Sequence, residues 1–350
     1  MDTAATISSG ISPNRFRELD FIRGILAIAV VMYHNGLSPK VQGGFCVSVF
    51  FILSGFVMSY AYGKKIKNGA MGIMDFALLR LGRLYPLIFI GSIMSILIGF
   101  LLWVRMPDLN SIFLNLFLLQ GIGTNFGFIP AFWSIGVEFW VGLTLFYGIL
   151  RYKAYFINFL IVLALLFFAY GGKDSLFFGI DVGAINSRIR SGLFGVGAGV
   201  IIYQIYFYFT HYKLDNLTKK SLTFMFYLLF VTMIMYIFGS KSIAVFKVKE
   251  IYALILASAM ILLGALLKNQ CKLFCAKWQS WLGDISYSVY VYHFLAIWII
   301  RSMIDMNNND MFNIVCGHLA VIAIVLIVSH YSSKYIEKPA YKWFRAKIGR

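Results

Sequence analysis

An arginine and a histidine lie within one apolar segment near the start of the chain. Arg23 and His34 are eleven residues apart, close to three helical turns, so both are predicted to lie on one face roughly 16 Å apart. Asp20 lies one turn before Arg23 and shares that face. An arginine facing lipid costs roughly 2.5–3.5 kcal/mol at a helix centre, so this face is predicted to point into the protein. An imidazole placed there can act as a general base near neutral pH.

A glutamate lies about halfway along the apolar segment 128–150. Ser134 and Glu138 are four residues apart and share one helical face, directly after Trp133. An ionisable side chain at mid-membrane depth indicates a functional site. The alternative is a structural hydrogen bond from Glu138 to a neighbouring helix.

A third polar stripe lies in the apolar segment 281–300. Ser286, Tyr290 and His293 follow one another at intervals of four and three residues, which places them on one helical face. Their hydroxyl and imidazole groups are predicted to line the same polar interior. For His293, a catalytic and a structural role both remain open.

Two arginines three residues apart, Arg80 and Arg83, follow a basic loop. On a helix they are predicted to project together at the inner membrane surface. Two forked guanidinium groups side by side are suited to binding a phosphate-bearing ligand. An anchor at the membrane surface, or a contact with anionic lipid, explains the same pair.

The composition indicates what must position these residues. The chain has 350 residues, of which 60% are hydrophobic and only 13% charged, and its mean hydropathy is +0.80. Soluble domains average about 25% charged residues, so an all-α polytopic membrane helix bundle is predicted. The ten predicted membrane spans are 21–37, 44–62, 84–104, 128–150, 154–170, 191–209, 221–239, 250–267, 281–300 and 312–331. The apolar stretch 111–122 is too short to cross and is predicted to be re-entrant or interfacial.

The basic residues predict the orientation of the bundle. With ten spans and a cytoplasmic N-terminus, about 22 of the 31 Lys and Arg lie on the inner side. If the stretch 111–122 also crosses, the split becomes about 15 to 16. The positive-inside rule therefore favours ten spans with both ends in the cytoplasm. One integral membrane domain is predicted over 1–350, with short cytoplasmic tails at 1–20 and 332–350. The rule also explains the net charge of +17 without a nucleic-acid partner. The four cysteines lack the spacing of a metal site, and no metal is expected.

Six motifs in order resemble the acyltransferase 3 family of integral membrane acyltransferases. They are Leu19-Asp20 with Arg23-Gly24 and His34; Phe50 to Phe56; Arg80 and Arg83 followed by Tyr85-Pro86; Trp133-Ser134 with Glu138; Ser286 to His293; and Glu337-Lys338-Pro339. The resemblance covers the chain almost end to end. One departure is Ser48, which stands where many members carry an aspartate.

The resemblance implies an O-acyltransferase that moves an acyl group, usually acetyl, from cytoplasmic acyl-CoA to a hydroxyl of a glycan or other acceptor. It implies no permanently bound cofactor; acetyl-CoA is a co-substrate. The expected catalytic residues are His34, Glu138 and Asp20, with His34 as general base or transient acyl carrier. The expected donor-binding residues are Arg23, Arg80 and Arg83. The expected supporting or acceptor-binding residues are Trp133, Ser134, Ser286, Tyr290 and His293.

The expected location is the inner membrane of a bacterium, with both termini in the cytoplasm. A transporter or exporter of a glycan or small polar substrate is the alternative, because intramembrane Asp, Glu and His groups also relay protons or bind substrates. Against it, the sequence shows no inverted repeat and no matched pair of broken helices. Dependence on an acyl-CoA donor separates the two functions.

Overall fold

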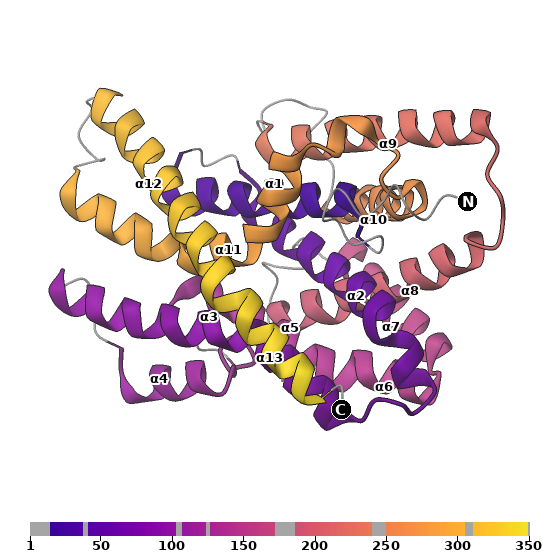
Figure 1. Ribbon diagram of the computed structural model, residues 1–350, viewed down its shortest axis with the longest axis horizontal. Helices are drawn as coiled ribbons and strands as arrows, with labels where there is room; N and C mark the ends of the chain where they lie inside the picture. The colour runs from indigo at the N-terminus through magenta and orange to yellow at the C-terminus, as the bar shows by residue number, and fades with distance from the viewer. Residues whose placement is uncertain are drawn as a thin grey trace.

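The computed structural model describes residues 15–37, 41–102, 107–123, 127–171, 186–239, 250–304 and 311–348, and these contain helices and no β-strand (Figure 1). The α-helices are α1 (Arg17–Asn35), α2 (Gly43–Lys67), α3 (Ile73–Leu101), α4 (Leu109–Leu116), α5 (Trp133–Val141), α6 (Tyr147–Tyr152), α7 (Tyr155–Gly171), α8 (Ser187–Phe209), α9 (Asn216–Phe238), α10 (Glu250–Leu267), α11 (Lys277–Met303), α12 (Met311–Ser332) and α13 (Lys338–Ile348). The connecting 3₁₀-helices are η2 (Pro130–Phe132) and η5 (Lys272–Phe274), and the π-helices are η3 (Gly142–Phe146) and η6 (Ser333–Glu337).

The protein is a multi-pass membrane protein, and each of the ten predicted spans is helical. Among the described residues, 7 helices are long and apolar enough to cross a membrane, fewer than the ten predicted. The other three predicted spans correspond to α1, α7 and α11. Helix α7 has only 17 residues, and the polar and charged side chains of α1 and α11 lower their hydropathy. These same polar side chains form the site described below.

Glycines allow the central helices to approach one another closely. A Cβ atom at Gly55 of α2 would lie 2.3 Å from the backbone oxygen of Val196 in α8. A Cβ atom at Gly283 of α11 would lie 2.4 Å from the backbone oxygen of Asp20 in α1. Small residues at such crossings are typical of membrane helix pairs. The α1–α11 contact matters most, because these two helices carry the two candidate site histidines.

Helix α3 begins eleven residues before the predicted span 84–104. The carboxylate of Asp75 accepts a hydrogen bond from the backbone N–H of Gly72 at 3.3 Å, which starts the helix there. Arg80 and Arg83 are therefore the eighth and eleventh residues of α3, although the predicted span began only at 84. This is why they point into the bundle, as the site geometry shows.

The C-terminal segment 332–350, predicted as a tail, is helical to Ile348. Its sequence is too polar to resemble a span, but one face of α13 is apolar and packs on α3. A Cβ atom at Gly82 would lie 2.4 Å from Phe344, so the two helices meet closely. Most of the predicted N-terminal tail, residues 1–14, lies outside the described residues, and 17–20 belong to α1. The stretch 111–122 overlaps α4, a helix of only 8 residues that ends at Leu116, and turns follow it.

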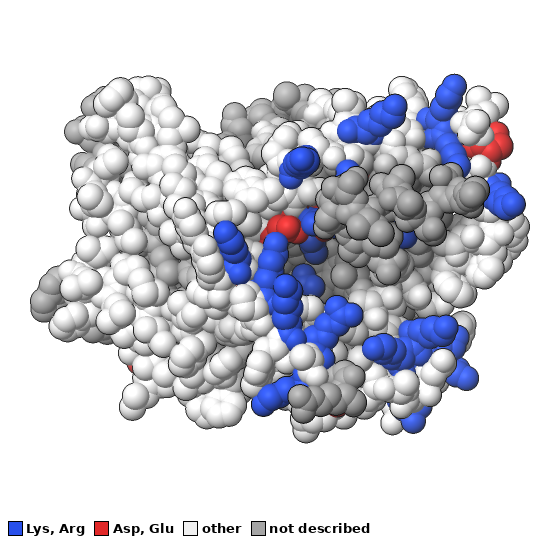
Figure 2. All heavy atoms as spheres, in the orientation of Figure 1, with Lys and Arg blue, Asp and Glu red and all other residues white. Residues whose placement is uncertain are grey.

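The basic side chains are unevenly distributed over the molecule. In Figure 2, Lys and Arg gather over the central and right-hand parts of the view, along α13 and around the α8–α9 connection. The left-hand part, where α11 ends and α12 begins, shows almost none. We call the part of the molecule around α13 and the α8–α9 connection the basic end.

Candidate active site

Two histidines meet inside the bundle where α1 ends. The rings of His34 and His293 have centroids 5.2 Å apart, and the ring of Phe294 lies 4.7 Å from each. Helix α1 ends directly after His34 because Gly36 adopts a left-handed conformation, φ 77°, and its N–H caps the carbonyls of Met32 and Tyr33. The sequence placed both histidines on polar faces, and the packing of α1 on α11 brings them together.

The hydrogen bonding of His293 fixes which of its nitrogens carries the proton. His293 is fully buried, and its Nδ1 lies 2.7 Å from the carbonyl oxygen of Tyr290. A carbonyl can only accept, so Nδ1 donates, and in a neutral ring Nε2 then holds a lone pair. This buried Nε2 has no partner among the described residues. His293 therefore offers an acceptor next to His34.

Tyr290 and Ser134 join α11 to the start of α5. Their hydroxyl oxygens lie 2.7 Å apart, and the Tyr290 hydroxyl also donates to the carbonyl of Ala131 at 3.0 Å. That carbonyl lies in the 3₁₀ turn that begins at Pro130. Ser286, two turns before His293 in α11, donates to its own helix at the Gly283 carbonyl, 2.8 Å away. The predicted stripe of α11 thus faces the interior, as expected.

Glu138, whose side chain is 23% exposed, forms an ion pair with the buried Arg80, and Ser54 Oγ donates to the same carboxylate oxygen at 2.5 Å. Arg80 is 4% exposed, so it points into the bundle and does not project from it as predicted. Nor does Glu138 contact His34. The π-helix that follows α5 is a feature often found near functional sites. The ring of Trp133 lies 6.2 Å from the ring of Phe51 in α2.

Two adjoining cavities lead from the basic end into the bundle. The larger, about 1000 Å³, is lined mainly by residues of α1, α2, α3 and α13, with basic and aromatic side chains among them. The smaller, about 100 Å³, is lined by Arg83, Glu138 and Tyr290 among others. Arg23, Leu53 and Val57 line both. We call them the outer cavity and the inner cavity.

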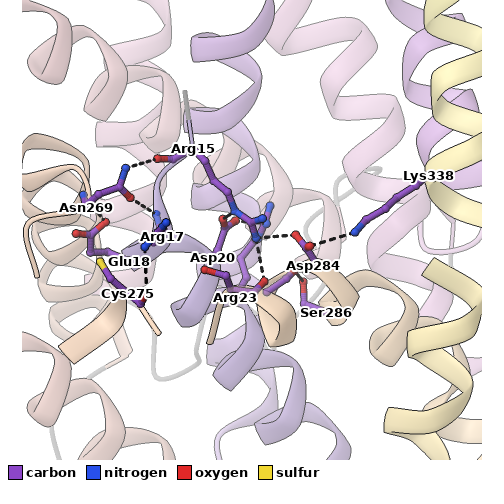
Figure 3. A network of polar contacts seen from close by, with 12 residues as sticks. Arg15, Arg17, Glu18, Asp20, Arg23, Asn269, Cys275, Asp284, Ser286 and Lys338 are labelled. Atoms are coloured by element: carbon purple, nitrogen blue, oxygen red, sulfur yellow. Dashed lines mark hydrogen bonds and ion pairs between the residues drawn. The ribbon is translucent and has the colours of Figure 1, made fainter. Parts of the chain in front are cut away.

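An ion-pair network lies beside the outer cavity (Figure 3). Asp20 pairs with Arg15 and with Arg23. Arg15 also pairs with Asp284 at 2.6 Å, and Lys338 pairs with Asp284 at 3.1 Å. Asp20 is fourteen residues before His34, or roughly 21 Å along α1, so the structure does not bring it to the histidine pair.

A second polar branch in Figure 3 holds the start of α1 to the α10–α11 connection. The Glu18 carboxylate accepts from the backbone N–H groups of Asn269, at 2.9 Å, and Cys271, at 3.2 Å. Burial, and next the Glu18 carboxylate, raise the pKa of the Cys271 thiol to about 12. This branch fastens the start of α1 to the α10–α11 connection.

The structure gathers most of the predicted residues into two groups, with a third set beside the inner cavity. The first group lies in the bundle interior and consists of His34, His293, Tyr290 and Ser134. The second is part of the ion-pair network and consists of Arg23 and Asp20. The residues beside the inner cavity are Arg80, Arg83 and Glu138. Spacing along the sequence did not reveal five further side chains around the site, namely Ser54, Arg15, Asp284, Lys342 and Arg345. The only signal for Asp284 was a lone carboxylate near the start of a predicted span. Within the described ranges, no group of three metal-ligating side chains forms.

Comparison with known proteins identifies one family. The family model described as an acyltransferase domain matches residues 16–330. A curated relative, "Protein 2 in picA locus" of Rhizobium radiobacter, is 43% identical over 79 residues, covering 21% of this chain and 41% of that protein. The match therefore spans less than half of the relative. No solved structure matches.

Proposed function

The chain belongs to the acyltransferase 3 family, and from this we propose that it moves an acetyl group from cytoplasmic acyl-CoA to a hydroxyl of a carbohydrate or glycan acceptor. The family makes it a membrane acyltransferase. The donor, the acyl group, the acceptor and the residue roles that follow are parts of the proposal.

The observation that carries the proposal is the pair of adjoining cavities. Ligand sites in proteins have volumes of about 300–1,000 Å³, and the outer cavity is about 1000 Å³. Its basic lining suits the phosphates of a nucleotide-bearing donor. The inner cavity is smaller, about 100 Å³, and lies between Arg23 and Tyr290. In this proposal the pantetheine arm carries the thioester past Arg23 toward Tyr290.

Arg23 and Arg83 are the better donor ligands of the three predicted arginines. Both line the inner cavity, and Arg23 stands where it joins the outer cavity. Arg80 also lines the inner cavity, but its side chain is only 5% exposed and pairs with Glu138. Arg23 pairs with Asp20, yet its side chain is 21% exposed and keeps a side that a donor can reach. Arg80 and Glu138 therefore act together as positioning residues, which hold α3 against α5.

His34 performs the proton transfer in this proposal. As general base it removes the proton of the acceptor hydroxyl, and the oxygen attacks the thioester carbonyl. The new C–O bond forms, the C–S bond breaks, and the departing sulfur takes the proton from His34 to leave as the thiol of coenzyme A. If His34 instead carries the acyl group transiently, acid quenching during turnover traps label on the protein. His293 packs beside His34, with ring centroids 5.2 Å apart, and limits the positions that the His34 ring can take.

The proposed location is a bacterial inner membrane, with the basic end and both termini in the cytoplasm. The positive-inside rule supports this orientation, and it places the outer cavity where acyl-CoA is present. The acceptor would then approach from the opposite end of α1, where Tyr33 and Leu37 are exposed.

The test compares membranes that contain the native protein or His34→Ala at equal abundance. Each receives labelled acetyl-CoA and a glycan fraction, and labelled glycan is measured. Label with the native protein alone is the expected result. Equal label with both proteins would remove His34 from the chemistry. No label with either, together with no acetyl-CoA binding, would overturn the proposal and favour an exporter.

A further inference from the structure

One wall of the outer cavity is formed by the C-terminal helix α13, which the sequence predicted as a tail. Five of its residues line the cavity, namely Tyr341, Lys342, Arg345, Ala346 and Ile348. Their spacing of three and four residues identifies a single helical face. Figure 2 shows basic side chains following this helix over the surface of the molecule.

Helix α13 is held firmly on the cavity. The Tyr341 hydroxyl lies 3.0 Å from the hydroxyl of Tyr62 in α2. Lys338, at the first position of α13, pairs with Asp284 of α11 at 3.1 Å. Phe344 packs against Gly82 of α3. The cavity face of α13 is therefore fixed by contacts with three other helices.

The charges around the outer cavity are of two kinds. Its lining has five basic side chains, Arg15, Arg23, Lys65, Lys342 and Arg345, and two acidic ones, Asp20 and Asp75. Asp20 is paired with Arg15 and Arg23. The Asp75 carboxylate caps the start of α3. Lys65, Lys342 and Arg345 have no carboxylate partner among the described residues, so their charges are available to an anion.

The order of residues along the two cavities gives the direction of a bound donor. Arg23 lines both cavities, whereas Lys342 and Arg345 line only the outer one. If the thioester of acyl-CoA enters the inner cavity, its diphosphate follows near Arg23. The end of the donor farthest from the thioester, the adenosine ribose with its 3′-phosphate, then reaches the wall formed by α13.

We propose that Lys342 and Arg345, with Lys65, bind the 3′-phosphate of the acyl-CoA donor and select it over donors that lack this group. The inference rests on the proposed function, which supplies the donor. A phosphate monoester carries a charge of about −1.5 to −2 near neutral pH. An arginine fork beside two ammonium groups matches both its charge and its geometry.

Binding of labelled coenzyme A and of 3′-dephospho-coenzyme A to the full-length protein in detergent tests the inference. The proteins compared are the native chain, Lys342→Gln with Arg345→Gln, and the control Lys347→Gln. Lys347 lies on the same helix, but its ammonium group stacks over the Trp343 ring at 4.0 Å and does not line the cavity. Size-exclusion elution confirms that each variant is folded.

We expect the native protein and the control to bind coenzyme A about tenfold more tightly than the dephospho form, as loss of charge-assisted hydrogen bonds predicts. The double variant should bind both forms with the weaker affinity. Equal native affinity for the two forms, an equal loss for both in the double variant, or no binding at all would overturn the inference. Acetyl transfer is measured separately, because intact, phosphate-dependent binding without transfer would overturn only the proposed function.

Discussion

The outer cavity and the histidine pair are built from opposite kinds of interaction. Around the cavity, partly exposed charges pair with one another, as in Arg15 and Asp284, whose side chains are 25% and 31% exposed. At the histidine pair, neutral groups share short hydrogen bonds, as between His293 and the Tyr290 carbonyl. Charge is therefore concentrated where water can screen it, and neutral groups occupy the interior.

This difference has a physical reason. An isolated charge in a low-dielectric interior is costly, whereas a hydrogen-bonded neutral group is not. The charged cavity can attract and hold an anion, and the neutral centre can fix a tautomer and a ring orientation. The Arg80–Glu138 pair is an exception, because it places two charges beside the inner cavity. Four predictions test this contrast.

The largest expected effect concerns chemistry at the neutral centre. His34→Ala should lower acetyl transfer by about 10²–10⁴-fold, the contribution of a positioned general base, while leaving acetyl-CoA binding unchanged. Transfer assays and binding assays on the same membranes measure the two quantities. His330→Ala is the control, since His330 accepts a hydrogen bond from Trp281, twelve residues before His293 and near the start of α11. A parallel loss of acetyl-CoA binding would show that His34 contributes to donor binding and not to chemistry alone.

The second prediction compares the two kinds of ion pair. Glu138→Gln should destabilise the protein by about 3–5 kcal/mol, because it leaves the buried Arg80 guanidinium without its counter-charge. Asp284→Asn should cost less than about 1 kcal/mol, since its partners are more exposed. Thermal unfolding in detergent measures both. Similar losses for the two variants would remove the distinction between the regions.

The third prediction uses salt, which screens exposed charges more than buried ones. Raising the ionic strength from about 0.05 M to about 0.5 M should raise KM for acetyl-CoA severalfold and leave kcat unchanged. Steady-state kinetics in proteoliposomes give both constants. A fall in kcat with constant KM would indicate that the sensitive charges lie at the reaction centre.

The smallest effect concerns the Glu18 branch beside the cavity. Burial raises the pKa of the Cys271 thiol to about 12, and the thiolate is the reactive form. Below that pH the thiol dominates, so alkylation at about pH 8 should be very slow and should quicken as the pH rises. Mass spectrometry after iodoacetamide treatment measures it. Rapid labelling at about pH 8 would show that this branch opens.

The sequence determined most of the secondary structure of this protein. Its apolar segments predicted ten helices, because a membrane span requires about twenty apolar residues and polar connections separate them. It also determined which faces of α1, α5 and α11 are polar, because helical spacing fixes those faces regardless of context. Family membership followed from the same local motifs.

Only the tertiary structure decided which of these polar faces meet. The packing of α1 on α11 places His34 beside His293 and leaves Asp20 some 21 Å away along the helix. The early start of α3 buries Arg80 against Glu138, although its spacing resembles that of a surface arginine pair. Helix α13 forms part of the outer cavity although its sequence is polar. Such contacts join residues far apart in the chain, and spacing along one helix carries no information about its neighbours.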